Sequence, residues 1–114
     1  MAVDPKLEET FKAFCAEWMQ KLAVRERDNR ASIKWVTVAE GVQGEFVGYS
    51  TDNVCEVKEP AYAGATPVGT IKYREMRYRK SGPTKEEAAK SPDTAIEMTE
   101  VTEIFRFAGG KWVY

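Results

Sequence analysis

The 114-residue sequence contains no histidine, and this absence removes several kinds of chemistry. Histidine is the base of most nucleophile triads, the commonest general base near neutral pH and the commonest metal ligand. Only two cysteines are present, Cys15 and Cys55, and neither belongs to a CxxC pair. We therefore expect neither a zinc site nor any other cofactor.

Signals for export and for membrane insertion are also missing. The N-terminal residues Met1–Pro5 have neither the basic segment nor the apolar segment of a secretory signal. No apolar run approaches the roughly 18–20 residues that span a bilayer. These absences predict a cytoplasmic protein without a membrane segment. In that compartment we expect Cys15 and Cys55 to be buried reduced thiols rather than a disulfide.

The sequence has no excess of either charge, because 17 basic and 18 acidic residues give a net charge of −1. Residues 72–80 (KYREMRYRK) form a basic run with two tyrosines that could stack on bases. The simpler explanation is a charge ladder between two neighbouring strands, Arg74, Arg77 and Arg79 against Glu97, Glu100 and Glu103. Overall neutrality favours the ladder, so nucleic acid is not the expected partner.

A long helix is predicted at the N-terminus. Asp4–Pro5 combines an N-cap side chain with proline at the first helical position. The pattern fades into the charged residues 25–30, which gives a helix of about 24 residues. Apolar residues at spacings of three and four form one stripe along it: Leu7, Phe11, Phe14, Cys15, Trp18 and Leu22. Such a helix needs a partner surface, because it is too amphipathic to be stable alone in water.

The rest of the chain alternates in the manner of β-strands, with predicted strands at 32–39, 45–57, 68–80, 94–107 and 111–114. A turn is expected at residues 40–44. Gly48 and the polar residues 50–53 lie inside the second predicted strand, where they indicate a bulge or bend that curves the sheet.

Two local signals complete the predicted elements. Thr84 and Glu87 match a capping box that begins a short helix, which Ser91–Pro92 ends. Gly109–Gly110 fits a two-residue hairpin turn. That turn would place Phe107 opposite Trp112 and Phe105 opposite Tyr114.

This order of elements predicts an α+β fold with a long N-terminal helix packed on a curved antiparallel sheet of four to five strands. A short helix precedes the fourth strand, and the length fits one domain over residues 1–114. The order resembles the cystatin-like fold shared by cystatins and the NTF2-like group. Residues 102–112 (TEIFRFAGGKW) are also similar to the closing hairpin of SnoaL-like NTF2 relatives. In the NTF2-like group the resemblance implies a cone-shaped ligand pocket between helix and sheet.

The sequence departs from both relatives in ways that bear on activity. NTF2-like proteins usually carry two or three helices before most of the sheet, whereas this chain offers one. Cystatins that inhibit cysteine proteases use a Gln-x-Val-x-Gly hairpin, and residues 41–44 (GVQG) do not match it. The single helix favours the simpler cystatin-like arrangement, and the different hairpin means that protease inhibition is not expected. The catalytic residues of NTF2-like isomerases and dehydratases are not expected either, because the chain has no histidine and no Asp–Tyr set that aligns with theirs.

The resemblance indicates where a ligand would bind. The aromatic residues that would line the mouth of such a pocket are Trp18, Trp35, Tyr49, Tyr73 and Phe105. Asp52 or Glu75 would supply a carboxylate, which could act as a general base once removed from water. The competing interpretation is a filled core with surface carboxylates, and the short chain with one main helix favours it.

A curved sheet covered by one helix leaves an open apolar face, which related folds often bury in a dimer. The candidate residues on that face are Met76, Val101, Ile104 and Val113. The competing interpretation is ordinary scattered surface hydrophobes. We expect a non-catalytic binding or protein-interaction module that forms a homodimer. The alternative is an NTF2-like small-molecule-binding protein or enzyme that uses the cone.

Overall fold

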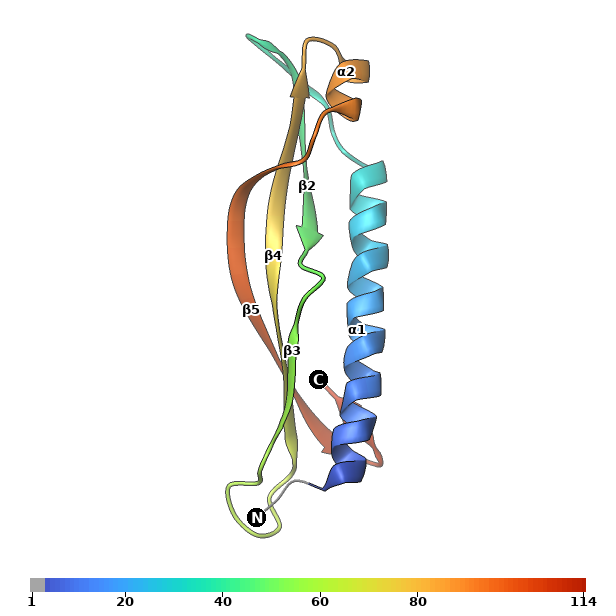
Figure 1. Ribbon diagram of the computed structural model, residues 1–114, viewed down its shortest axis with the longest axis vertical. Helices are drawn as coiled ribbons and strands as arrows, with labels where there is room; N and C mark the ends of the chain where they lie inside the picture. The colour runs from blue at the N-terminus through green and yellow to red at the C-terminus, as the bar shows by residue number, and fades with distance from the viewer. Residues whose placement is uncertain (1–3) are drawn as a thin grey trace. The chain divides into compact units, whose positions relative to one another are not determined.

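The computed structural model describes residues 4–114. Met1–Val3, which belong to the N-terminal segment without a predicted export signal, lie outside the described residues. The fold is α+β, as predicted, with a long N-terminal helix, a curled antiparallel sheet and a short helix before the last long strand (Figure 1). In chain order the elements are α1 (Pro5–Ala31), β1 (Val36–Val38), β2 (Gly41–Tyr49), β3 (Val54–Lys58), β4 (Val68–Gly82), α2 (Lys85–Lys90), β5 (Thr94–Ala108) and β6 (Lys111–Val113).

The sheet has six strands rather than the four to five predicted, because the predicted strand 45–57 is two strands. The polar residues 50–53 separate β2 from β3, so they break the strand where only a bend was expected. Both strands pair antiparallel with β4, β2 along residues 75–82 and β3 along residues 68–72. The remaining neighbours follow the order β1-β2-β4-β5-β6.

The local end signals are confirmed. The backbone N–H of Lys6 donates to Asp4 Oδ1 over 2.9 Å, which is the predicted N-cap of a helix that runs for 27 residues. The N–H of Glu87 donates in the same way to Thr84 Oγ1 at the start of α2.

The predicted turn at 40–44 lies earlier, because Val38 already pairs with Gly41. None of the helices in residues 4–114 is long and apolar enough to cross a membrane.

The closing hairpin also follows the prediction. Gly109 and Gly110 have φ values of 63° and 78°, in the left-handed region that glycine adopts readily. Phe107 pairs with Trp112 across the hairpin, and their ring centroids lie 5.2 Å apart.

Contacts divide the chain into two compact units. The first contains the chain up to Lys21 together with Thr51–Tyr73 and Glu100–Tyr114, and the second contains Leu22–Ser50 and Arg74–Thr99. Three elements, α1, β4 and β5, contribute residues to both, so each unit has its own helical segment and strands. The prediction of one domain over residues 1–114 stays a prediction.

The core of the first unit is aromatic. Phe11 and Phe105 are almost fully buried, and the ring centroid of Phe11 lies 4.6 Å from that of Trp112. Gly69 on β4 leaves room for the Phe11 ring, because a Cβ at that glycine would stand 2.5 Å from the ring. A side chain there would therefore push the helix off the strand.

The second unit has a smaller apolar core around Leu22, Phe46 and Ala88. Phe46 stacks on Tyr78 with ring centroids 5.2 Å apart. The guanidinium carbon of Arg30 lies 4.4 Å from the centre of the Phe46 ring, within range of a cation–π contact. Gly48 lies in regular pairing opposite Met76, and it accommodates the side chain of Glu26 rather than marking a bulge.

The expectation of reduced thiols is wrong, since Cys15 and Cys55 form a disulfide between α1 and β3, with Cα atoms 6.6 Å apart. Cys15 is buried, as its place on the apolar stripe predicts. Cys55 pairs with Ile71 of β4, and its side chain meets the helix. The two residues are 40 positions apart in sequence, so only the folding of β3 against α1 brings them together.

Removal of this disulfide should lower the free energy of unfolding by about 4 kcal/mol, the chain-entropy value for a loop of this length. The measurement is urea unfolding of the oxidised protein, with and without reductant, beside a Cys15→Ala/Cys55→Ala variant. The reductant should destabilise the unaltered protein and leave the variant unchanged. Equal stability of all four samples would show that the disulfide contributes nothing.

Candidate functional site

The predicted pocket residues are divided between the two units. Trp18, Asp52, Tyr73 and Phe105 belong to the first unit, whereas Trp35, Tyr49 and Glu75 belong to the second. In the first unit the ring centroids of Trp18 and Phe105 lie 5.0 Å apart in an edge-to-face contact, and Tyr73 is buried. Asp52 is exposed in the break between β2 and β3.

In the second unit, Tyr49 and Glu75 are direct partners across β2 and β4. Trp35 lies outside the strands and packs against Gly44 of β2. The seven predicted pocket residues thus belong to two different units. A single pocket lined by all seven stays a prediction.

A different carboxylate lies among the aromatic residues of the first unit. The hydroxyl of Tyr73 donates to Glu103 Oε1 over 3.0 Å, and the hydroxyl of Tyr114 donates to Glu103 Oε2. The hydrogen bond to Glu103 raises the pKa of the Tyr114 phenol. From the sequence, Glu103 was predicted only as an ion-pair partner for an arginine of the charge ladder. Its position two residues before Phe105 on β5 was the available signal, because alternate residues of a strand share a face.

The first unit also has a groove of about 460 Å³ between α1 and the closing hairpin. Its lining residues are Thr10, Ala13, Phe14, Glu17, Phe107, Gly110, Lys111 and Trp112. Trp112 is held in place by its indole N–H, which donates to Thr10 Oγ1 over 3.1 Å. The groove thus combines aromatic walls with an acidic residue from the helix and a basic residue from β6.

A smaller hollow of about 330 Å³ adjoins the disulfide. It is lined by Glu8, Phe11, Lys12, Cys55, Glu56 and Val57. None of the predicted pocket residues lines either hollow. The groove residues were missed because their proximity depends on how α1 meets the hairpin, which no local sequence pattern reports.

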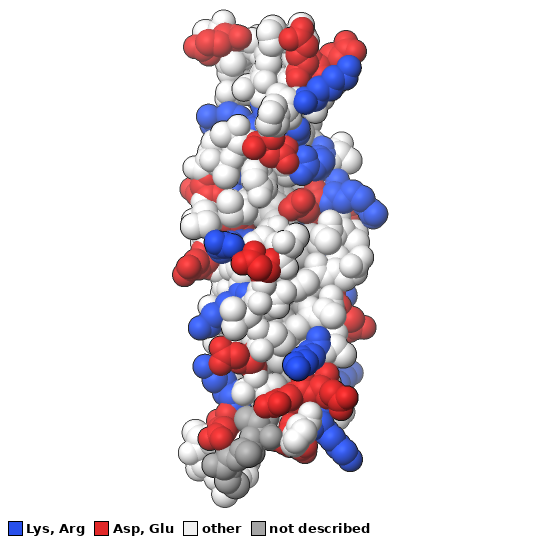
Figure 2. Space-filling view, in the orientation of Figure 1, with Lys and Arg blue, Asp and Glu red and all other residues white. Residues whose placement is uncertain are grey.

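Two arginines of the basic run 72–80, both in the second unit, form ion pairs with neighbouring strands. Arg77 lies 3.6 Å from Glu97, as predicted, and 3.7 Å from Glu45. Arg79 contacts Glu45 at 2.7 Å, a partner on β2 that was not predicted. Figure 2 shows the same mixture, with basic and acidic side chains interspersed over the visible face.

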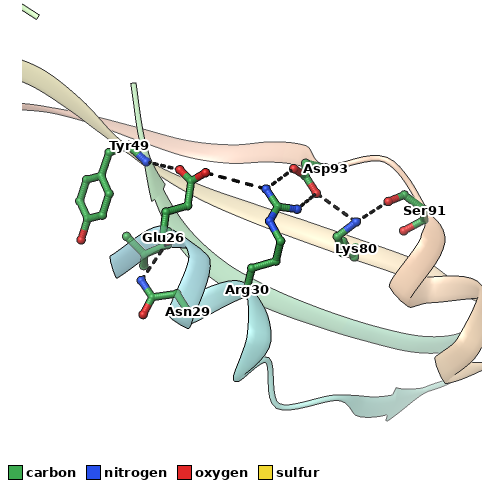
Figure 3. A network of polar contacts seen from close by, with 8 residues as sticks. Glu26, Asn29, Arg30, Tyr49, Lys80, Ser91 and Asp93 are labelled. Atoms are coloured by element: carbon green, nitrogen blue, oxygen red, sulfur yellow. Dashed lines mark hydrogen bonds and ion pairs between the residues drawn. The ribbon is translucent and has the colours of Figure 1, made fainter. Parts of the chain in front are cut away.

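Lys80 belongs to a network of polar contacts at the end of α1 (Figure 3). Arg30 donates two hydrogen bonds to the Asp93 carboxylate, at 3.0 and 2.9 Å. The Lys80 side chain is only 9% exposed, lies 3.1 Å from Asp93 and donates to the carbonyl of Ser91. Two side chains of α1 also meet β2, since Glu26 accepts from the N–H of Tyr49 and Asn29 donates to the carbonyl of Val47.

The network is electrostatically matched. The hydrogen bonds from Arg30, with a further one from Lys80, hold the pKa of the Asp93 carboxyl below its ordinary value against the opposing effect of partial burial. The same contact raises the pKa of Arg30. These groups stabilise one another, and this arrangement ties the end of α1 to the segment that follows α2.

Side chains that could hold a metal ion, and matches to known proteins, were both sought among the described residues and the sequence. Among residues 4–114 there is no group of three or more side chains of the types that hold a metal ion. No family model matches the chain, and neither a curated protein nor a solved structure matches it.

The four dimer candidates differ in exposure. Ile104 is exposed, whereas Met76, Val101 and Val113 are half-buried. Val54 is a further exposed apolar residue, on β3.

An Asp93→Asn variant should lose about 1–2 kcal/mol of unfolding free energy at neutral pH, a value reduced for the exposure of Arg30. A carboxyl with a lowered folded pKa contributes stability above its unfolded pKa of about 3.9, and that stability is lost as the pH falls through the folded pKa. The difference between the two proteins should therefore shrink below about pH 4 in urea unfolding. The control is Glu86→Gln, which breaks an ion pair with both side chains about 80% exposed and should change stability by less than about 0.5 kcal/mol. A deficit that stays constant down to pH 2 would contradict this role for Asp93.

Proposed function

We propose that this protein is a non-catalytic binding module that holds a small amphipathic ligand in the groove between α1 and the closing hairpin. The observation that carries the proposal is the groove itself, about 460 Å³ in volume with aromatic walls and opposite charges at Glu17 and Lys111. That volume lies within the range of about 300–1,000 Å³ typical of small-molecule sites.

The chemistry of the walls defines the ligand class. Phe14, Phe107 and Trp112 favour a flat apolar body, because aromatic rings prefer offset or edge contacts with other rings. Lys111 favours an anionic substituent and Glu17 a cationic one. A ring-sized molecule with a charged group satisfies both parts of the groove.

The alternative is an NTF2-like small-molecule-binding protein or enzyme that uses a pocket between helix and sheet. The observation that favours it is the Glu103 carboxylate, which accepts hydrogen bonds from two tyrosines among aromatic side chains. The helix-and-sheet architecture is compatible with the cystatin-like and NTF2-like resemblance, and membership of either group stays a proposal.

The homodimer and the cytoplasmic location also stay proposals. Exposed Ile104 and Val54 support a second copy on the sheet, and a mass measurement in solution would test this. The Cys15–Cys55 disulfide counts against the cytoplasm, because disulfides persist mainly in oxidising compartments.

The groove is tested by blocking it from the helix. Ala13 lines the groove and is exposed, so Ala13→Glu should occupy it without disturbing the core or the helix. The probe is 8-anilinonaphthalene-1-sulfonate, an aromatic anion whose fluorescence rises in apolar sites. We expect Ala13→Glu to weaken probe binding about tenfold, the effect of losing about 1.4 kcal/mol.

The matched control is Ala16→Glu, which adds the same side chain to an exposed position of α1 outside the groove lining. It should bind the probe like the unaltered protein. Lys111→Glu should also weaken binding, because it replaces attraction for the sulfonate by repulsion. Equal binding by all four proteins would rule out the groove as the site.

A further inference from the structure

Tyr114, which follows β6 in the first unit, makes specific contacts although it is largely exposed. Its ring centroid lies 5.9 Å from that of Trp18, at an interplanar angle of 89°, and 5.2 Å from that of Phe105. Its hydroxyl donates to Glu103 Oε2. Yet 77% of the residue is accessible to solvent. A side chain held in this way can leave at little loss of buried area.

The surroundings of Tyr114 are organised by other residues. Glu103 is oriented by Tyr73, which is buried and donates to the other carboxylate oxygen. Phe105 is almost fully buried, and its ring is in edge-to-face contact with that of Trp18. The walls and the carboxylate therefore keep their places when Tyr114 moves away.

The same cluster contains an unsatisfied donor. The indole nitrogen of Trp18 is buried, and within residues 4–114 it has no hydrogen-bond partner. Buried indole N–H groups usually find an acceptor. The cluster therefore contains a buried polar group that the packing of the described residues does not satisfy.

We propose that Glu103, Trp18 and Phe105 form a binding site for a small hydroxy-aromatic molecule, and that Tyr114 occupies this site from within the same chain. The ligand's ring takes the place of the Tyr114 ring against Trp18 and Phe105. Its hydroxyl donates to Glu103 Oε2, and the negative charge of the carboxylate strengthens that hydrogen bond. The site is separate from the groove, because none of these residues lines it.

An internal occupant lowers the apparent affinity for an external ligand. Only molecules in which Tyr114 has left the site can bind, so the apparent dissociation constant rises by the inverse of that fraction. Tethering to β6 gives Tyr114 a high effective concentration at Glu103. Removal of its ring should therefore strengthen binding of a phenol that competes for the same contacts.

The test uses p-cresol, which has the ring and hydroxyl of a tyrosine side chain, and toluene, which lacks the hydroxyl. Binding is followed through the NMR shift of the Trp18 indole N–H, which reports directly on this cluster. We expect Tyr114→Ala to bind p-cresol about tenfold more tightly than the unaltered protein does and to prefer it to toluene. Tyr62→Ala removes a tyrosine that is similarly exposed, at 71%, from the same unit and should change nothing.

Two further variants separate this site from the groove. Glu103→Gln in the Tyr114→Ala background should abolish the preference for p-cresol over toluene, because the charged acceptor is gone. Ala13→Glu in that background should leave the gain intact, so failure of the groove and failure of this site give different results. Unchanged p-cresol affinity in Tyr114→Ala, or an equal gain for toluene, would overturn the proposal.

Discussion

The contact between Phe11 and Gly69 sets the distance between helix and strand on which the first unit depends. With no side chain at Gly69, the Phe11 ring packs against β4 while it also contacts Trp112. The same helical stripe then brings Cys15 to the disulfide and Trp18 to the aromatic cluster one turn later. The groove and the Tyr114 contacts both follow from this close approach, because their walls come from the helix and from the strands beneath it.

The second unit is stabilised by different means. Its apolar core is small, and ion pairs between charged side chains make many of the contacts between its helices and strands. The side chain of Arg30 makes three contacts, with the ring of Phe46, with the Asp93 carboxylate between α2 and β5, and with Glu26 on its own helix. Because these charged groups are paired with one another, they contribute to stability and have few donors or acceptors left to bind a ligand. The candidate sites therefore lie in the first unit, where an aromatic groove and a carboxylate adjoin exposed side chains.

The sequence predicted those features that depend on neighbouring residues. Asp4, Thr84 and the Gly109–Gly110 turn each act through backbone groups a few positions away, so their elements appear where expected. The features that were missed depend on contacts between distant residues. The disulfide forms only when β3 folds against α1. The Glu103 carboxylate on β5 accepts from Tyr73 and Tyr114 only when β4 and the residue after β6 lie beside it. No periodicity in the sequence carries that information, since it arises only from register and packing.

The disulfide also has a mechanical consequence. The covalent loop that it closes runs from Cys15 to Cys55 and encloses residues 22–50, the whole N-terminal segment of the second unit. Tension applied to the two ends of the oxidised chain would bypass this loop, because the force would cross from α1 to β3 through the sulfur bridge. With 40 residues at about 3.3 Å each, roughly 130 Å of chain would stay unextended until the bridge was reduced. Oxidised and reduced molecules would then differ in how far they stretch, and the second unit's helix segment, β1 and β2 would bear no load in the oxidised form.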